Sequence, residues 1–259
     1  MSRNICRSQA RPDWPQHKES DNISLPSLTL EKRLEITLPD HTKLVIAPCS
    51  PIIKVHPGVS DSMLSEIETA IGTYLPEDVR RLLYEHDVKI TLCPFMTDGF
   101  PELKSNHGSG RKGGWAKDSS ADNCGGMWCY GTREVAITEK VINYWTKDPT
   151  ETTDRAMILR HEVGHAVDLE YHGGDWSMLL SKQAGFLKSY NADRREISKQ
   201  PEEARKLAYF LQRGAGPGEA FASAFATAIS QGAEAEREFG RHFHRSVEHI
   251  RNDVLSRLG

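Results

Sequence analysis

The sequence predicts an α+β fold, in which a small mixed sheet is followed by a helical C-terminal half. Two observations support this prediction. Short alternating apolar and polar runs and Gly-rich stretches occupy the first half, whereas apolar residues recur at helical spacing from residue 152 onward. Strands that come first and helices that come afterwards are typical of an α+β domain.

Composition excludes several classes of partner. The chain has 259 residues, a formal net charge of -3 and no basic excess, so we expect no nucleic-acid partner. No apolar run reaches the roughly 18 residues that cross a bilayer, and we expect no membrane partner. The N-terminus also lacks the apolar core of a secretory signal peptide. We therefore expect a soluble protein, whose oligomeric state the sequence leaves open.

The sequence of residues 1–58 predicts a leader and a hairpin. Residues 1–28 are rich in Ser, Arg, Asn and Pro and poor in aliphatic residues, which predicts a disordered leader. Residues 29–259 are expected to form a single domain. Within it, "RLEITLPDHTKLVIAP" alternates on either side of a Pro-Asp-His turn, so residues 29–58 are expected to form a β-hairpin extension.

Two helices and two strands are expected next. "SDSMLSEIETAIGTYL" has apolar residues at helical spacing and Ser60 or Asp61 as its N-cap, and "LPEDVRRLLYEHD" predicts a second helix. "VKITLC" predicts a short strand. From Pro94 to Gly131 the pattern dissolves, which predicts a long loop that lines a binding groove. "REVAITE" then predicts a strand, either at a free sheet edge or inside the sheet.

The rest of the chain predicts helices. Their expected ranges are 152–171, about 175–190, 201–213, 218–231 and 233–256.

The cysteines do not predict a disulfide framework. There are five of them, an odd number spread thinly: Cys6, Cys49, Cys93, Cys124 and Cys129. "CGGMWC", which begins at Cys124, lacks the second pair that a zinc knuckle needs. We interpret its cysteines as reduced thiols in a loop.

The stretch "ILRHEVGHAVDLE", residues 158–170, carries the main chemical signal. On a helix, His161 and His165 share one face and can present two imidazole nitrogens to one metal ion. Glu162 is then placed to act as general base toward a water at that metal. The apolar surroundings favour this interpretation, because buried His and Glu side chains need partners. The alternative is an ordinary core helix without metal.

A glycine inside this helix predicts close packing. Gly164 lowers helix stability by about 1 kcal/mol relative to Ala. Such a residue usually marks the close approach of a neighbouring backbone.

A catalytic zinc site needs a third protein ligand. The metzincin pattern is excluded, because Asp168 and Tyr171 occupy the positions of its glycine and third histidine. "GPGEAFASAFATAIS" places Glu219 in the first turn of an apolar helix, and we expect Glu219 to be the third ligand. The alternative is that Glu219 only interacts favourably with the helix dipole.

The two motifs "ILRHEVGHAVD" and "GEAFASAF" together resemble the catalytic domain of anthrax lethal factor and its relatives, which include the Pro-Pro endopeptidases. The resemblance covers roughly residues 60–256. It implies a gluzincin-type zinc metallopeptidase in which His161, His165 and Glu219 bind one zinc ion and Glu162 is the general base. It also implies that Asp168 orients a ligand histidine.

Two positions depart from the family pattern. Relatives often carry a glutamate four residues after the third ligand, where this chain has Ser223. They also carry an oxyanion-stabilising tyrosine seven residues before that ligand, where this chain has Gln212. Tyr209 is the nearest tyrosine and our candidate for that role, because an oxyanion donor is judged by geometry. Tyr190 or a backbone amide is the alternative.

The resulting hypothesis is a zinc-dependent metalloendopeptidase that hydrolyses peptide bonds in a protein or peptide substrate. The resemblance implies a toxin or effector that acts on a host protein, secreted or translocated without a classical signal peptide; otherwise we expect a cytoplasmic protein. Two alternatives stay open. The first is a catalytically silent relative that binds zinc and a partner protein, and the second is a metal-free binding module.

Overall fold

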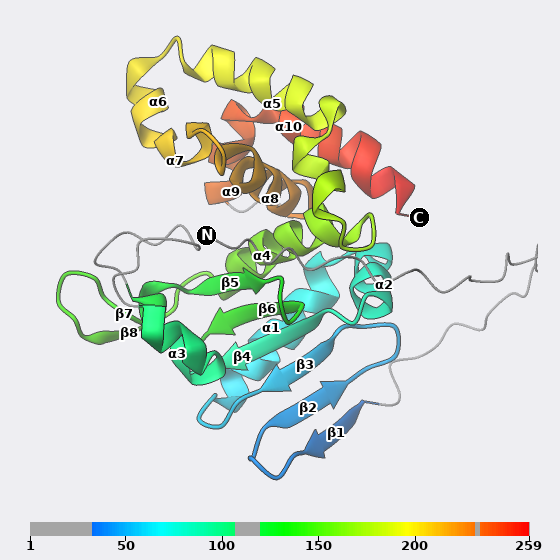
Figure 1. The fold of residues 1–259 in the computed structure, drawn as a ribbon, viewed down its shortest axis with the longest axis vertical. Helices are drawn as coiled ribbons and strands as arrows, with labels where there is room; N and C mark the ends of the chain where they lie inside the picture. Colours follow the sequence, from blue (N-terminus) through cyan, green and yellow to red (C-terminus); the bar gives the residue numbers. More distant parts are fainter. Residues whose placement is uncertain (1–32, 107–119, 231–233, 259) are drawn as a thin grey trace, which may run out of the picture. The chain divides into compact units, whose positions relative to one another are not determined.

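A six-stranded mixed sheet with helices packed on it forms the first half of the protein, and helices form the second half (Figure 1). The computed structural model describes residues 33–106, 120–230 and 234–258, which belong to a unit that spans Lys32–Gly259. The α+β prediction is confirmed. The predicted leader, residues 1–28, lies outside the described residues, and the domain boundary at residue 29 stays a prediction.

The strands and helices have the following bounds. The strands are β1 (Leu34–Thr37), β2 (Lys43–Ile46), β3 (Ile52–Val55), β4 (Lys89–Cys93), β5 (Gly126–Cys129), β6 (Glu134–Thr138), β7 (Lys140–Ile142) and β8 (Pro149–Glu151). The α-helices are α1 (Asp61–Tyr74), α2 (Glu77–Glu85), α3 (Met96–Gly99), α4 (Arg155–Glu170), α5 (Ala184–Ile197), α6 (Pro201–Lys206), α7 (Ala208–Leu211), α8 (Gly216–Ile229), α9 (Glu234–His242) and α10 (His244–His249). Short helical turns are η1 (Pro101–Asn106), η2 (Ala121–Asn123), η3 (Trp176–Met178), η4 (Leu180–Lys182), η5 (Ile250–Val254) and η6 (Leu255–Arg257).

The N-terminal strands belong to the main sheet. β1 and β2 form the predicted antiparallel hairpin, but β2 also pairs with β3, and β3 pairs in parallel with β4. The hairpin therefore continues the main sheet, and the assignment of residues 29–58 as an extension of the domain stays a prediction. β3 was missed because it is a run of only four residues that follows a proline directly.

The prediction of a structureless loop from Pro94 to Gly131 was also wrong. This segment contains α3, η1, η2 and the strand β5; residues 107–119 lie outside the described residues. The order of the sheet is β1-β2-β3-β4-β6-β5, so "REVAITE" (β6) is an internal strand and β5 forms the edge. The possibility that β6 is a free edge is thereby overturned. The signal of β5 was weak, because two glycines precede its three side chains.

The helix α4 lies at the centre of the fold. It packs against β5 and β6, contacts α1 and α2, and packs against α8 from the helical half (Figure 1). Its buried residues Leu159, Val163, Ala166 and Val167 belong to the main hydrophobic core. This position between two layers explains why no residue of α4 is exposed.

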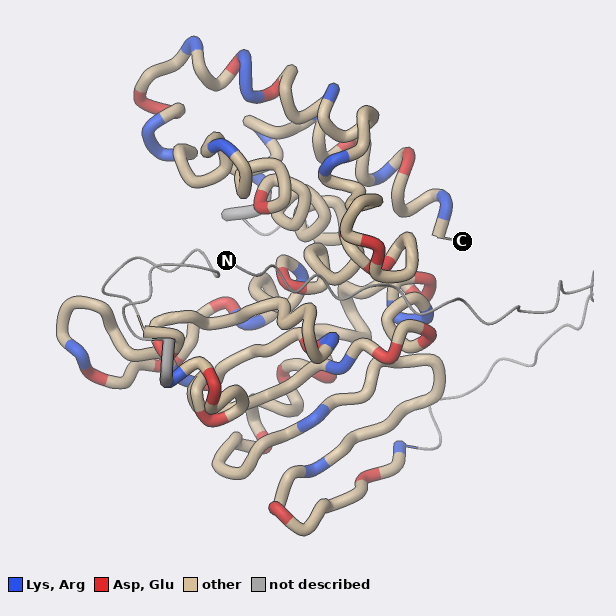
Figure 2. Tube along the Cα trace, viewed as in Figure 1, with Lys and Arg blue, Asp and Glu red and all other residues tan. Residues whose placement is uncertain are grey.

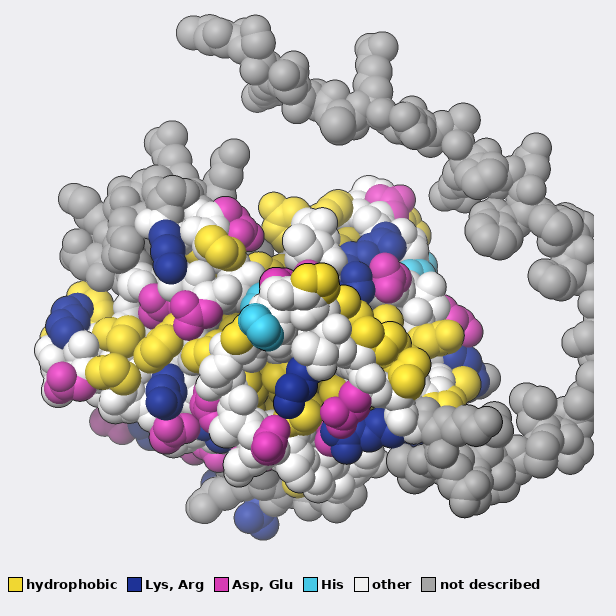
Figure 3. Space-filling model, turned by 90° about the horizontal axis from the view of Figure 1, so that it is seen from below, with side chains coloured by type: hydrophobic (Ala, Val, Ile, Leu, Met, Phe, Trp, Pro, Cys, Tyr) yellow, Lys and Arg dark blue, Asp and Glu magenta, His cyan; other side chains and the backbone are white. Residues whose placement is uncertain are grey.

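The surface of the described residues mixes charge and apolar groups. Figure 2 shows basic and acidic residues interspersed in both halves of the protein. Hydrophobic side chains lie between charged ones on the face seen in Figure 3. Large exposed hydrophobic residues include Leu34 and Ile36 in β1 and Trp145 between β7 and β8. Among the described residues, the helices are all too short or too polar to cross a membrane.

Candidate metal centre

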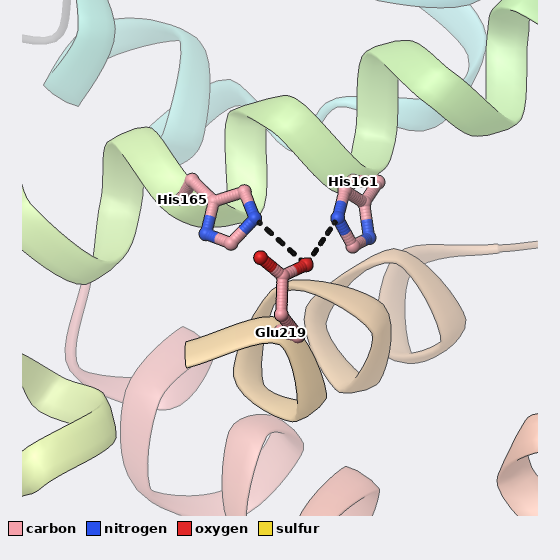
Figure 4. Close-up of side chains that lie close together, drawn as sticks. All are labelled: His161, His165 and Glu219. Carbon is pink, nitrogen blue, oxygen red and sulfur yellow. Dashed lines mark ion pairs between the residues drawn. The ribbon is translucent and has the colours of Figure 1, made fainter. Parts of the chain in front are cut away.

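Three predicted ligands meet between α4 and α8 (Figure 4). His161 and His165 lie one turn apart on α4, and Glu219 lies in the first turn of α8. Oε2 of Glu219 is 3.4 Å from Nε2 of His161 and 3.5 Å from Nε2 of His165. One ligand atom from each residue lies within 4.8 Å of the others, so the group could hold a metal ion.

The close approach of the two helices depends on Gly164. A Cβ atom at this position would lie 2.8 Å from Cα and 2.9 Å from the carbonyl oxygen of Ala222. No side chain fits at that distance, so the predicted close backbone approach is confirmed. The contact sets Glu219, one turn before Ala222, opposite the two histidines.

The donor set suits a zinc ion. The three side chains are about one-fifth exposed, and together they offer two neutral nitrogen ligands and one carboxylate, as in catalytic zinc sites with an open position. Burial favours the protonated form of Glu219, but His161 and His165 hold the pKa of that carboxyl well below its usual range. Burial opposes protonation of His165, yet the neighbouring carboxylates, Glu219 first, leave its pKa raised. The site therefore attracts positive charge.

Glu162 lies beside this group and against the edge strand. A Cβ atom on Gly126 would lie 3.1 Å from Cγ of Glu162 and would overlap the side chain of Ile158. The start of β5 therefore touches the face of α4 that carries Glu162. Sequence reasoning missed the role of Gly125 and Gly126, although two consecutive glycines before a strand are a signal for such an approach.

Of the two candidate tyrosines, only Tyr209 reaches the metal-ligand group. Its hydroxyl interacts with Glu219, and burial together with this carboxylate raises the pKa of Tyr209 well above its usual range. The phenol thus keeps its proton at neutral pH. Tyr190 is 2% exposed and donates a hydrogen bond to the carbonyl oxygen of Phe210 at 2.8 Å, so it is a core residue.

Asp168 on α4 and Ser223 on α8 are two further residues close to the ligand histidines. The carboxylate of Asp168 accepts a hydrogen bond from the backbone N–H of Ser181 at 2.6 Å, so it fastens η4 to α4 and acts on His165 through its charge. Oγ of Ser223 lies 3.1 Å from Nδ1 of His161. Sequence reasoning treated Ser223 only as a departure from the family pattern. Its position one turn after Glu219 was the available signal.

A cavity of about 490 Å³ lies next to the ligands. His161, Glu162 and Ser223 line it. Most of the remaining lining is apolar and includes Met157, Ile158, Leu207, Phe210 and Phe239. The cavity can therefore take a large apolar group close to Glu162.

The described cysteines are free thiols: Cys49, Cys93, Cys124 and Cys129. Burial raises the pKa of Cys124 to about 11 and that of Cys93 to about 12. Cys124 lines the cavity but does not belong to the metal-ligand group. The interpretation of these cysteines as reduced thiols agrees with this environment, but Cys129 lies in β5 and not in a loop. Cys6 lies outside the described residues.

Comparison with known proteins finds similarity to solved structures. The chain is similar to the structure of the Pro-Pro endopeptidase PPEP-2 from Paenibacillus alvei, with 19% sequence identity and a TM-score of 0.49. The match covers 76% of this chain and 95% of that one. No protein-family model matches this chain, and no curated protein matches it. A likeness this distant carries no argument about activity, which therefore has to rest on the site itself.

Proposed function

We propose that this protein is a zinc-dependent metalloendopeptidase that hydrolyses peptide bonds in a protein or peptide substrate. The observation that carries the proposal is the meeting of His161, His165 and Glu219 at ligand distance, with Glu162 on the same helix beside them. Two imidazoles, a carboxylate and an adjacent general base are the set that metal-assisted peptide hydrolysis needs. A metal-free core helix gives no reason for this grouping.

The proposed roles follow from the geometry. Zinc held by His161, His165 and Glu219 would supply a Lewis acid that activates water and polarises a carbonyl group. Glu162 takes a proton from the attacking water and later passes it to the leaving amine. The hydroxyl of Tyr209 donates a hydrogen bond to the carbonyl oxygen as negative charge develops there.

The substrate would bind along the edge of the sheet. β5 pairs only with β6 among the described strands, so its other edge could pair with an extended peptide. The strand begins at Gly126, beside Glu162, which would bring a peptide paired with β5 to the general base. The apolar cavity next to Glu162 would take a large apolar side chain adjacent to the cut.

A toxin or effector role in a host cell rests on the family resemblance of the two motifs alone. Two contacts support activity over a catalytically silent relative. Ser223 contacts a ligand histidine, and Tyr209 lies beside Glu219. The endopeptidase is therefore the better supported function.

The test compares the parent with Glu162→Gln on a proteome-derived peptide library, with new termini mapped by mass spectrometry. We expect cleavage by the parent next to apolar residues, and a loss of about 10³-fold or more in the variant, since this is the scale of general acid–base catalysis. Both proteins should carry one zinc ion. Zinc without cleavage in the parent would favour the silent relative, and cleavage by both proteins would contradict the role of Glu162.

A further inference from the structure

The hydroxyl of Ser223 occupies the far side of the His161 ring from the metal-ligand group. Nε2 of His161 faces Glu219 at 3.4 Å, and Nδ1 of the same ring lies 3.1 Å from Oγ of Ser223. Both contacts come from α8, on which residues 219 and 223 lie one turn apart on one face. The helix α8 thus supplies a contact partner for each of the two ring nitrogens of His161.

We propose that Ser223 is a positioning residue that sets the tautomer and the orientation of His161. The proposal rests on the zinc site of the proposed function. A histidine that binds zinc through Nε2 carries its proton on Nδ1, and that N–H needs an acceptor. Ser223 Oγ accepts this hydrogen bond, and Nε2 keeps its lone pair for the metal.

The hydrogen bond of Ser223 differs from that of a carboxylate. A neutral hydroxyl carries no charge, so it fixes the ring without adding a negative charge next to the ligands. The serine is itself held, because it lies inside α8 and its backbone carbonyl accepts a hydrogen bond from Thr227 Oγ1 at 2.8 Å. Ser223 is therefore a fixed and neutral partner of His161.

The same contacts align a hydroxyl, an imidazole and a carboxylate, which raises the question of a serine nucleophile. Such a nucleophile needs free backbone N–H donors beside it to stabilise the oxyanion. Ser223 lies in the middle of α8, where the neighbouring amides are engaged in the helix. The geometry favours a positioning role.

The test is zinc affinity, measured by chelator competition on the full chain of the parent, Ser223→Ala and Ser223→Thr. Loss of an outer partner of a ligand histidine typically weakens metal binding about 10- to 100-fold, and we expect about tenfold for Ser223→Ala. Ser223→Thr keeps the hydroxyl and should restore the parent affinity. The matched control is Ser198→Ala at the end of α5, whose hydroxyl donates a hydrogen bond to the carbonyl oxygen of Arg194; this variant should leave affinity within about twofold.

A second measurement separates positioning from general stability. Nitrogen-15 NMR of the zinc-loaded parent should show His161 protonated at Nδ1, and zinc-loaded Ser223→Ala should show altered Nδ1 exchange with an unchanged melting temperature before loading. Equal zinc affinity and equal His161 spectra in the parent and Ser223→Ala would overturn the proposal. Hydrolysis that resists chelation and disappears in Ser223→Ala would overturn it in favour of a serine nucleophile.

Failure of the proposed function gives a different result. A parent that binds zinc but cleaves nothing overturns the endopeptidase and leaves the affinity comparison decisive for Ser223. A parent that binds no zinc overturns both.

Discussion

The candidate site lies between two regions that are built differently. The helix wall consists of α4 and α8, and the strand wall consists of Gly125 and β5. Each depends on a glycine, but Gly164 faces the backbone of Ala222, whereas Gly126 faces mainly the side chains of Ile158 and Glu162. β5 is the edge strand of the sheet and can move away from α4, whereas the backbone of α8 is packed in the core and cannot. The helix wall should therefore tolerate no added volume, whereas the strand wall should adjust.

The largest effect is expected from Gly164→Ala. The new methyl group would force α4 away from α8, an overpacking effect of about 3 kcal/mol that the better helix propensity of Ala offsets by about 1 kcal/mol. We expect a net loss of about 2 kcal/mol in the free energy of unfolding and weaker zinc binding. Denaturant titration and chelator competition measure the two effects.

The control for Gly164→Ala is Gly72→Ala in α1. A Cβ atom at Gly72 would have no neighbour within 4 Å, so this variant should gain about 1 kcal/mol from helix propensity. Equal stability changes in the two variants would refute the tight contact between α4 and α8.

A smaller effect is expected from Gly126→Ala on the strand wall. The new Cβ atom would overlap Cγ2 of Ile158, and the edge strand β5 can move to relieve this contact, so the free energy of unfolding should fall by about 1 kcal/mol and zinc affinity should stay unchanged. The rate of peptide cleavage should fall by more than the loss of folded protein explains, because β5 or Glu162 is displaced. Gly131→Ala, where a Cβ atom would have no neighbour within 4 Å, is the matched control. Loss of zinc in Gly126→Ala would contradict the separation of the two walls.

The smallest effect on the fold is expected from Tyr209→Phe. This residue is 55% exposed, so removal of its hydroxyl should leave the melting temperature unchanged, and the variant should still bind one zinc ion at saturating zinc. If the hydroxyl stabilises the developing oxyanion, kcat should fall by about 10²-fold while KM changes little. Tyr84→Phe, a similarly exposed tyrosine in α2, is the control. An unchanged kcat in Tyr209→Phe would contradict the role of Tyr209 as oxyanion donor and leave a backbone amide as the candidate.

The helix wall could be predicted from the sequence, and the strand wall could not. In an α-helix, the spacing of residues along the sequence fixes which side chains share a face. The prediction therefore needed only local signals: the spacing of His161 and His165, the first-turn position of Glu219 and the isolated Gly164. Ser60 and Asp61 were the two predicted N-cap candidates for the same reason, and Ser60 is the cap, since its side chain accepts a hydrogen bond from the backbone N–H of Met63.

The strand wall was missed because its geometry depends on long-range pairing. β5 has too few side chains to show a period, and its partner β6 gives no sign of whether it is inside the sheet. The hairpin of β7 and β8 was missed likewise, since its strands have three residues each. The contact between Ser223 and His161 joins residues that are 62 positions apart, which spacing on one helix cannot reveal.

The central claim is that α4 and α8 together hold one catalytic zinc ion, and native mass spectrometry of the zinc-supplemented protein tests it most directly. The parent and Glu162→Gln should each retain one zinc ion per chain after dialysis, whereas His165→Ala and Glu219→Ala should retain none. The account would be contradicted if the parent retained no zinc, or if His165→Ala and Glu219→Ala both retained it.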